Sequence, residues 1–416
     1  MAPPPFRNPY RPGAGHPPPH LAGRKKERTE FQRLLTQETI LENMVLTGLR
    51  GVGKTVLLDS FRPEAIHAGW LWVGADLSES TSVSEETLAI RLLTDLAPVT
   101  STVPVGTAEM RRIGFETEAV RQTRVLDYAT LLGVYNGTPG LVADKLKTVL
   151  TLVWSLIATQ NRRGLVFAYD EAQNLSDQSD RDQYPLSLLL DVFQSIQKQG
   201  IPMMLFLTGL PTLFPKLVEA RTFSERMFRV VFLDRLSDSE SRDAILKPLS
   251  ATACPVRLDE RSVALVIEYS GGYPYFLQFI CKEVFDIFLQ KADVGERLTV
   301  PIGDITRKLD TDFFAGRWAR ATDRQREMLT IIARMLGSQG EFSVQEVVEQ
   351  SSQLLDKPFS SSHANQMLGS LCRAGLVYKN RRGRYSFAVP LLDQFILRQV
   401  GENPPRLQGK DADGEG

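Results

Sequence analysis

Short apolar runs alternate with longer amphipathic stretches over the first 240 or so residues of the chain. Five of the apolar runs have the length of strands and are bounded by polar or glycine-rich segments. They are MVLTG (44–48), GWLWVGADL (69–77), GLVFAYDEAQNL (164–175), IPMMLFLTGLP (201–211) and RVVFLDRLS (229–237). Because helical stretches separate these runs, the pattern predicts an α/β fold, with a parallel sheet covered by helices on both faces.

The stretch from about residue 78 to 145 is harder to interpret. It is too long to be a single crossover between neighbouring strands. We expect it to be a mainly helical insertion.

The pattern becomes helical from residue 238 onward. Gly271 and Gly272 are expected to end one helix, and Pro274 suits the first turn of the next. The apolar positions that follow Pro274 recur three or four residues apart, as on one face of a helix. Residues 238–318 are therefore predicted to form a small helical domain.

A third unit is predicted from residue 319 to 400. Ser343 and Glu346 form a capping-box pattern at the start of one helix, and Gly375 is suited to close another. The segment VYKNRRGRYSF (377–387) alternates around an Arg-Gly turn, which is typical of a hairpin. Helices followed by a basic hairpin predict a winged helix.

The two ends of the chain have a different composition. Eight of the first twenty residues are proline, so residues 1–20 cannot form a helix or an internal strand. Two interpretations stay open for this segment: a disordered tail, or an extended arm that Phe6 and Tyr10 anchor on a neighbouring domain. The last sixteen residues, 401–416, are expected to be disordered.

Composition narrows the function classes. With 49 basic and 49 acidic residues the formal net charge is zero, so nucleic-acid binding would need a local patch. Cys254, Cys281 and Cys372 are far apart and form no CxxC pair, which argues against a disulfide framework or a zinc ribbon. No apolar run approaches the 18 or so residues of a membrane-spanning helix. We expect no membrane contact and a cytoplasmic protein.

The segment GLRGVGKT (48–55) fits the phosphate-loop pattern G-x-x-x-x-G-K-[ST] completely. Its glycines allow backbone N–H groups to face phosphates, and the following helix adds its positive N-terminal end. Lys54 is expected to reach the terminal phosphates, and the Thr55 hydroxyl is expected to bind Mg²⁺. The predicted nucleotide contacts of this segment are Gly48, Leu49, Arg50, Gly51, Val52, Gly53, Lys54, Thr55 and Val56.

Two adjacent carboxylates, Asp170 and Glu171, come directly after the apolar run LVFAY. Downstream of a phosphate loop, two carboxylates at this position can have two different roles. Asp170 is expected to order the Mg²⁺ shell, and Glu171 is expected to polarise the attacking water.

With these motifs, residues of about 20 to 400 resemble P-loop ATPases of the AAA+ and STAND type, especially archaeal and bacterial ATPases related to origin-recognition and Cdc6 proteins. The resemblance implies a P-loop sheet, a helical lid and a winged helix that use ATP or ADP with Mg²⁺. Gly23 and Arg24 match a hydrophobic-x-G-R segment that lies near the adenine in this group. Thr208, at the end of the fourth predicted strand, corresponds to the polar sensor of the terminal phosphate.

These families also carry an arginine that reaches the nucleotide of a neighbouring subunit, just before the fifth strand. Arg226 is the first candidate here and Arg221 the second. A guanidinium at this place spreads positive charge over the transferring phosphoryl group. The alternative is a surface ion pair with Glu219 or Glu225. An arginine acting in trans implies a homo-oligomer formed on ATP binding.

The predicted lid differs in sequence from that of many AAA+ proteins. Many AAA+ proteins have an arginine early in the equivalent helix, whereas this chain has Gly271, Gly272, Tyr273 and Pro274. The GGxP segment is similar to that of STAND-type ATPases, in which the nucleotide state controls the lid, and it implies that Pro274 contacts the nucleotide. The resemblance therefore favours a slowly hydrolysing switch over a motor.

The winged-helix segment carries a local positive charge. From residue 317 to 400 there are 12 Lys and Arg against 7 Asp and Glu. On the candidate recognition helix, His363, Asn365 and Gln366 offer polar groups for base edges. The basic candidates for DNA contact are Arg373, Lys379, Arg381, Arg382 and Arg384.

Two functions stay open. One is an ATPase switch that binds duplex DNA through the winged helix. The other is a STAND-like signalling or scaffold ATPase whose winged helix and 78–145 insertion bind a protein partner. In both, the predicted order is an arm (1–20), an ATPase domain (21–237), a lid (238–318), a winged helix (319–400) and a tail (401–416).

Overall fold

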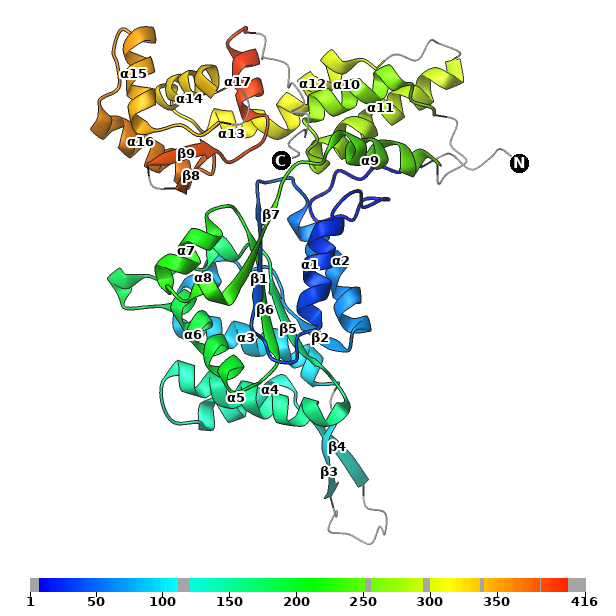
Figure 1. Ribbon diagram of the computed structural model, residues 1–416, viewed down its shortest axis with the longest axis vertical. Coiled ribbons are helices and arrows are strands. Elements are labelled where there is room, and N and C mark those ends of the chain that lie inside the picture. Colours follow the sequence, from blue (N-terminus) through cyan, green and yellow to red (C-terminus); the bar gives the residue numbers. More distant parts are fainter. Residues whose placement is uncertain are drawn as a thin grey trace, which may run out of the picture. The chain divides into compact units, whose positions relative to one another are not determined.

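The computed structural model describes residues 7–102, 104–110, 120–250, 256–294, 300–336, 340–381 and 383–402. The chain divides into two compact units, which are described separately. The sheet unit contains Lys25–Thr47 and Lys54–Phe232, and the lid unit contains Met1–Arg24, Gly48–Gly53 and Leu233–Gly416 (Figure 1). The predicted boundaries between ATPase, lid and winged-helix domains stay predictions.

The five predicted strands are all present in one sheet. The strand order is β2-β5-β6-β1-β7, and the β2–β5, β5–β6 and β1–β6 pairs are parallel. The three central strands are buried along their whole length, which explains their uninterrupted apolar sequences. The bounds are β1 Asn43–Gly48, β2 Trp70–Val73, β5 Gly164–Tyr169, β6 Met203–Gly209 and β7 Phe228–Leu233.

Helices cover both faces of this sheet (Figure 1). On one face Phe31 of α1 stacks on Phe61 of α2, with 4.4 Å between the ring centroids, and both rings contact Phe206 of β6. On the other face Phe193 of α6 packs edge-on against Phe167 of β5. The helices of the sheet unit are α1 Lys25–Leu35, α2 Lys54–His67, α3 Glu85–Thr100, α4 Tyr128–Gly137, α5 Val142–Ile157, α6 Pro185–Lys198, α7 Leu213–Ala220 and α8 Ser224–Met227.

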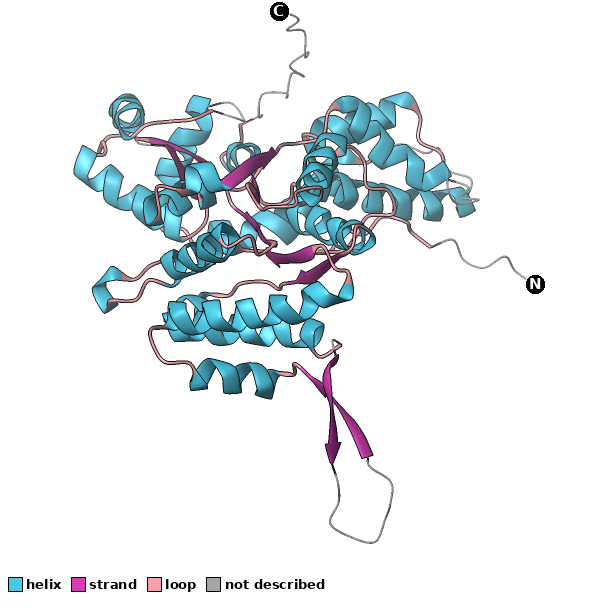
Figure 2. Cartoon of the chain, turned by 60° about the horizontal axis from the view of Figure 1, so that its bottom comes forward, coloured by secondary structure: helices cyan, strands magenta, loops and turns pink. Residues whose placement is uncertain are grey.

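The 78–145 insertion differs in part from the expectation. It contains α3, α4 and the start of α5, but it also contains an antiparallel pair of strands, β3 (Pro104–Met110) and β4 (Val120–Val125). Figure 2 shows this pair projecting from the helices of the same unit. Its sequence has few large apolar residues. Backbone pairing sets its conformation, and the apolar pattern therefore does not reveal it.

After β7 and the loop that follows it, the lid unit continues with a helical part. Gly271 and Gly272 have φ values of 59° and 73° and follow the end of α10, and Pro274 is the first residue of α11, as predicted. A Cβ atom at Gly272 would lie 2.5 Å from the carbonyl oxygen of Leu236, so only glycine fits there. The helices are α9 Asp238–Ser250, α10 Glu260–Ser270, α11 Pro274–Val294, α12 Ile302–Leu309 and α13 Ala315–Ala319, with a π-helical turn over Asp310–Phe314.

The described part of the proline-rich segment packs on this helical part. Tyr10 is buried, and its hydroxyl donates to the carbonyl oxygen of Ile245 at 2.5 Å. The Asn8 amide donates to the carbonyl oxygen of Lys282 at 2.8 Å and to the Asp286 carboxylate at 2.7 Å. These contacts favour the extended arm over the disordered tail. Phe6 lies outside the described residues.

The residues predicted to form a winged helix contain the expected helices and hairpin. The capping box between Ser343 and Glu346 is present, and Gly375, with φ 67°, follows the end of α16. Phe342 forms an isolated antiparallel bridge with Tyr385 of the hairpin, and the two rings stack. The elements are α14 Asp323–Leu336, α15 Val344–Leu354, α16 Ser361–Arg373, β8 Val377–Arg381, β9 Arg384–Phe387 and α17 Leu392–Gln399.

The remaining expectations concern the cysteines and the tail. Cys281 is buried and Cys372 is partly buried, and both are free thiols. Cys254 and residues 403–416 lie outside the described residues. Within the described ranges, no helix is long and apolar enough to cross a membrane.

Candidate functional site

The phosphate-loop sequence lies between β1 and α2, as its motif requires. Gly51 and Gly53 have φ values of 81° and 90°, which side chains other than glycine rarely adopt. At Gly48, a Cβ atom would lie 2.5 Å from the carbonyl oxygen of Leu233. Helix α2 begins at Lys54, so the positive end of its dipole directly follows the loop. The geometry suits an anionic phosphate.

Two of the predicted residues, Thr55 and Thr208, converge on Asp170, which directly follows β5. The Thr55 hydroxyl, in the first turn of α2, donates to one Asp170 carboxylate oxygen at 2.5 Å. The Thr208 hydroxyl donates to the other oxygen. Asp170 and Thr208 are buried and lie at the same level of adjacent parallel strands, because Tyr169 is paired with Leu207. The hydroxyl that follows the phosphate loop, the carboxylate and the residue predicted as a phosphate sensor therefore share one small site.

Two further carboxylates lie close to Asp170. Asp76 forms a parallel backbone bridge with Asp170, and Asp59 follows Thr55 by one turn of α2. Burial raises the pKa of Asp59, and the negative charges of Asp170 and Asp76 raise it further. Neither Asp76 nor Asp59 was predicted as part of the site, although the position of each in the sequence gave a signal. Asp76 lies near the end of a predicted strand, and Asp59 is four residues after Thr55 on the predicted helix.

The oxygen donors around Asp170 suit Mg²⁺. Hydroxyl and carboxylate oxygens are the protein ligands that this ion prefers, and it usually keeps several water and phosphate ligands. Within the described residues, no group of three or more His, Cys, Asp or Glu side chains is arranged to hold a metal by itself. Thr55 and Asp170 would therefore hold Mg²⁺ together with water and nucleotide phosphates.

Glu171 has an unusual backbone conformation. Its φ and ψ of 52° and 33° lie in the left-handed region, which costs a residue other than glycine about 1 kcal/mol or more. Its N–H donates to the Asp170 carboxylate at 2.7 Å. Its side chain is exposed, and one carboxylate oxygen accepts a hydrogen bond from the Gln173 amide. The turn thus places a second carboxylate beside Asp170, on the solvent side.

Gly23 and Arg24 support the phosphate loop. Both have positive φ, 67° and 66°, and Arg24 is buried. The Arg24 guanidinium donates to the carbonyl oxygen of Val52 at 3.1 Å and to that of Asp234 at 2.8 Å. Arg24 thereby ties the loop to the segment after β7. The adenine contact implied by the resemblance stays a prediction.

The start of α11 also contacts the loop. The Tyr275 N–H, next to Pro274, donates to the Gly51 carbonyl oxygen at 3.1 Å.

Arg317 was not predicted as a site residue, and it adds a positive charge in this unit. Burial lowers the pKa of Arg317, and the positive charge of Arg50 lowers it further.

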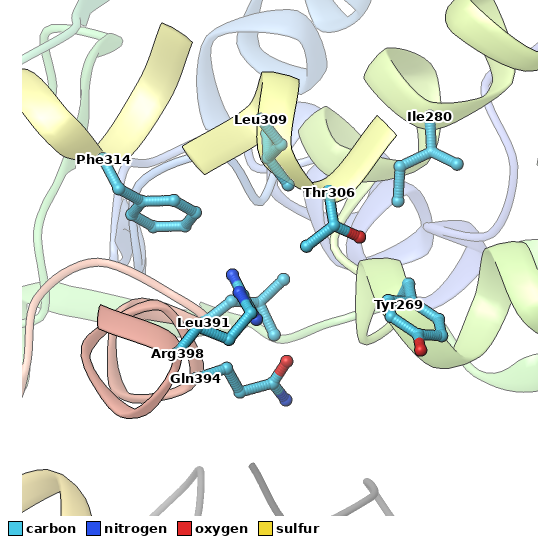
Figure 3. Close-up of a pocket in the computed structure, with 8 residues that line it drawn as sticks. All are labelled: Tyr269, Ile280, Thr306, Leu309, Phe314, Leu391, Gln394 and Arg398. Carbon is cyan, nitrogen blue, oxygen red and sulfur yellow. The ribbon is translucent and has the colours of Figure 1, made fainter. Parts of the chain in front are cut away.

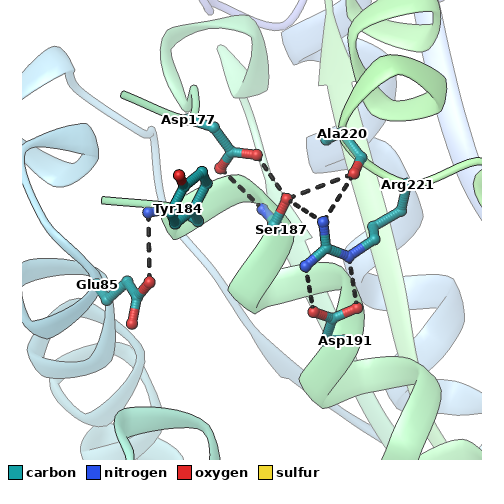
Figure 4. A network of polar contacts seen from close by, with 7 residues as sticks. All are labelled: Glu85, Asp177, Tyr184, Ser187, Asp191, Ala220 and Arg221. Carbon is teal, nitrogen blue, oxygen red and sulfur yellow. Dashed lines mark hydrogen bonds and ion pairs between the residues drawn. The ribbon is translucent and has the colours of Figure 1, made fainter. Parts of the chain in front are cut away.

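The two candidate arginines differ in their surroundings. Arg221 forms a bidentate ion pair with Asp191, at 2.8 and 2.6 Å, and donates to the Ser187 hydroxyl at 2.8 Å (Figure 4). Ser187 in turn donates to Asp177 at 2.5 Å. Arg221 is therefore engaged within its own unit.

Arg226 is exposed on α8, and its side chain has no ion pair or hydrogen bond within the described part of the chain. The expected alternative partners, Glu219 and Glu225, do not bind it in that part. Two residues of the adjacent edge strand β7, Val230 and Phe232, are also exposed. Of the two arginines, Arg226 is the one available to another molecule.

The residues predicted to contact DNA also differ in their surroundings. Arg373 and Lys379 are exposed, whereas Arg384 donates to both oxygens of Glu346, at 2.8 and 2.9 Å. Arg382 and the side chain of Arg381 lie outside the described residues. On α16, the polar candidates His363, Asn365 and Gln366 are exposed.

The described residues of the lid unit line a small cavity and a larger one. The smaller, of about 10 Å³, is a seam between α17 and the helical part, where Arg398 points toward Phe314 and Leu309 (Figure 3). This volume is room for one water molecule at most. Arg398 is bound to the Asp310 carboxylate, with one contact at 2.9 Å.

The larger cavity, of about 270 Å³, is lined by Leu49, Asp234, Tyr273 and residues of the wing and α17. Asp393 of α17 also lines it and is only 2% exposed. One Asp393 carboxylate oxygen has no hydrogen-bond partner among the described residues. Burial raises the pKa of Asp393 to about 6.

Comparison with known proteins gives a family match in sequence and a fold match in structure. A family model described as a domain of unknown function (DUF8462) matches residues 311–396. No curated protein sequence matches the chain.

The structure is similar to the ORC2 protein of Aeropyrum pernix in its ADP form, with a TM-score of 0.53 and 15% identity, over 94% of this chain and 98% of that one. For the ADPNP–ADP complexes of the same protein the TM-score is 0.50 and the identity 16%, over 94% and 98% of the two chains. Cdc6p from Pyrobaculum aerophilum has a TM-score of 0.46 and 14% identity, over 94% and 97%. The similarity to ORC2 confirms the predicted fold, that of AAA+ P-loop ATPases of the ORC/Cdc6 type.

Proposed function

We propose that the protein binds ATP with Mg²⁺, hydrolyses it slowly, and uses the nucleotide state to control the binding of duplex DNA by its winged helix. The observation that carries the proposal is the convergence of Thr55, the last residue of the phosphate-loop motif, and Thr208 on Asp170. A buried carboxylate that meets a hydroxyl at the start of the loop helix is the arrangement that Mg²⁺-nucleotide binding requires.

Different residues would bind the phosphates, coordinate the metal ion and orient the attacking water. Loop N–H groups, the N-terminal end of α2 and Lys54 hold the phosphates, while Thr55 and Asp170 orient the ion's coordination. When bound, Mg²⁺ supplies positive charge to the terminal phosphate oxygens. Glu171 orients a water molecule for attack and accepts its proton.

We infer slow turnover from the residues at the start of helix α11. Helix α11 begins with Pro274 and Tyr275, with no arginine in its first turn, and contacts the loop through a backbone hydrogen bond. The charge that promotes phosphoryl transfer would then come from Arg226 of another copy. ATP-dependent self-association through this exposed arginine is therefore part of the proposal.

DNA binding rests on the local charge of the winged helix. The segment 317–400 has 12 basic against 7 acidic residues, in a chain whose formal net charge is zero. Arg373 and Lys379 are exposed at the end of α16 and on β8, where they can contact phosphates. Arg384 contributes less, because Glu346 neutralises it.

The test is fluorescence anisotropy of a labelled random duplex at two salt concentrations, without nucleotide, with ADP and with a non-hydrolysable ATP analogue. Salt-sensitive binding that changes with the nucleotide supports the proposal. Absence of DNA binding in all three states overturns its DNA part and directs the search to a protein partner of the winged helix or of the 78–145 insertion. ATPase activity is measured on the same preparation and tests the nucleotide part independently.

A further inference from the structure

Gln173 connects Glu171 with the end of strand β6. It lies in a single 3₁₀ turn, Ala172–Asn174, that follows Glu171. Its side-chain N–H donates to the Glu171 carboxylate. Its side-chain oxygen accepts a hydrogen bond from the Leu210 N–H at 3.1 Å. Both ends of one amide are thus used, one on the carboxylate and one on the backbone that follows β6.

The two partners fix the orientation of this amide. An ionised carboxylate can only accept hydrogen bonds, and a backbone N–H can only donate. The nitrogen of Gln173 must therefore face Glu171 and its oxygen must face Leu210. Glutamate in this place has no N–H to donate, and leucine has neither group, so the amide is specifically required for both bonds.

The surroundings hold Gln173 in place. The Lys216 ammonium, from α7, donates to the Gln173 backbone oxygen at 2.7 Å. Burial lowers the pKa of Lys216. A Cβ atom at Gly209 would lie 2.6 Å from the Gln173 side-chain oxygen, so the glycine at the end of β6 leaves the space that this amide occupies.

We infer that Gln173 is a positioning residue that holds the Glu171 carboxylate in place and couples it to β6, two residues beyond Thr208. The inference rests on the proposed function, in which Glu171 orients the attacking water. Glu171 is exposed and its backbone is in the left-handed region, so its local conformation alone does not restrict the carboxylate. A hydrogen bond to a charged group supplies that restriction.

The experiment compares Gln173→Leu with the wild type in ATP turnover and in the affinity for a fluorescent ATP analogue. We expect kcat to fall about tenfold, the loss typical of one hydrogen bond to a charged group. KM and the nucleotide affinity should change less than about twofold, because Gln173 does not belong to the phosphate-binding residues. Gln178→Leu is the matched control, since its amide donates to the Ser82 backbone oxygen and does not contact Glu171.

A double-mutant cycle separates positioning from general support of the loop. In Glu171→Asp the carboxylate is one methylene shorter and loses the contact with Gln173. If Gln173 acts through Glu171, adding Gln173→Leu to this variant lowers kcat by less than about twofold. A second tenfold loss, or an equal loss in Gln178→Leu, overturns the inference.

The outcomes also separate this inference from the proposed function. No ATP turnover by the wild type, or full turnover by Glu171→Gln, refutes the ATPase assignment itself. If both behave as proposed while Gln173→Leu retains the wild-type kcat, only the role of Gln173 is wrong. Gln173→Glu provides a second variant of nearly the same size, and it must lower kcat as well.

Discussion

Replacing Asp393 by asparagine is expected to stabilise the lid unit at neutral pH. Asp393 is buried, one of its carboxylate oxygens has no partner among the described residues, and Arg398 is engaged by Asp310. Burial raises the pKa of Asp393 from its ordinary 3.8 to about 6. Hydrogen bonds from the N–H of Gln394 and from its own N–H, together with the positive charge of Arg398, only partly offset this. The folded state therefore holds its proton more tightly than the unfolded state does.

The size and direction of the effect follow from these pKa values. Between about pH 4 and pH 6 the unfolded chain loses the Asp393 proton first, so stability falls as the pH rises through this range. The difference of about two pH units, at about 1.36 kcal/mol each, amounts to about 3 kcal/mol of stability lost by neutral pH. Asparagine does not ionise, so Asp393→Asn avoids this loss.

The measurement is urea unfolding near pH 4 and near pH 7.5, with hydrogen exchange of the α17 peptide as the local probe. We expect Asp393→Asn to raise the free energy of unfolding by up to about 3 kcal/mol near pH 7.5 and by almost nothing near pH 4. Asp356→Asn, at an exposed position of the predicted winged helix, is the control and should show no such pH-dependent gain. An equal gain at both pH values, or a loss near pH 7.5, would show that the Asp393 carboxylate is not destabilised by burial.

Further predictions concern the nucleotide site, the two candidate arginines and DNA binding. Lys54→Ala should abolish or greatly weaken binding of a fluorescent ATP analogue, whereas Glu171→Gln should bind it normally and lower turnover about a hundredfold or more; normal turnover in both refutes the site. Arg226→Ala should lower turnover only at protein concentrations where light scattering detects self-association. Arg221→Ala should lower the free energy of unfolding by about 1 kcal/mol, because its ion pair is half-exposed, with no such concentration dependence. Lys379→Ala should reduce the salt-dependence slope of DNA affinity by about 1, and an unchanged slope would exclude it as a phosphate contact.

The parts of the fold that the sequence predicts are those set by burial or by local backbone geometry. The central strands are apolar throughout because both faces of the parallel sheet are covered. Gly51, Gly53 and Gly272 mark places where φ is positive. Strands β3 and β4 were missed because backbone pairing, with few large apolar residues in their sequence, forms them.

The parts of the site that the sequence does not predict depend on contacts between distant segments. Arg24 matched a family segment, but its bonds to Val52 and Asp234 span 28 and 210 residues of chain. The preference for Arg226 over Arg221 depends on where Asp191 lies in α6, one turn after Ser187. No spacing along the chain reveals either arrangement.

The contacts of β6 also bear on how a phosphate could be sensed. Thr208, at its end, donates to Asp170, and Leu210, just beyond it, donates to the amide that holds Glu171. The carboxylate proposed to order Mg²⁺ and the carboxylate proposed to orient water are therefore both connected to one strand end. A small shift of this strand end, as the terminal phosphate is gained or lost, would move both groups together. Such coupling lets one structural change alter both metal coordination and hydrolysis, which is what a slow nucleotide switch needs.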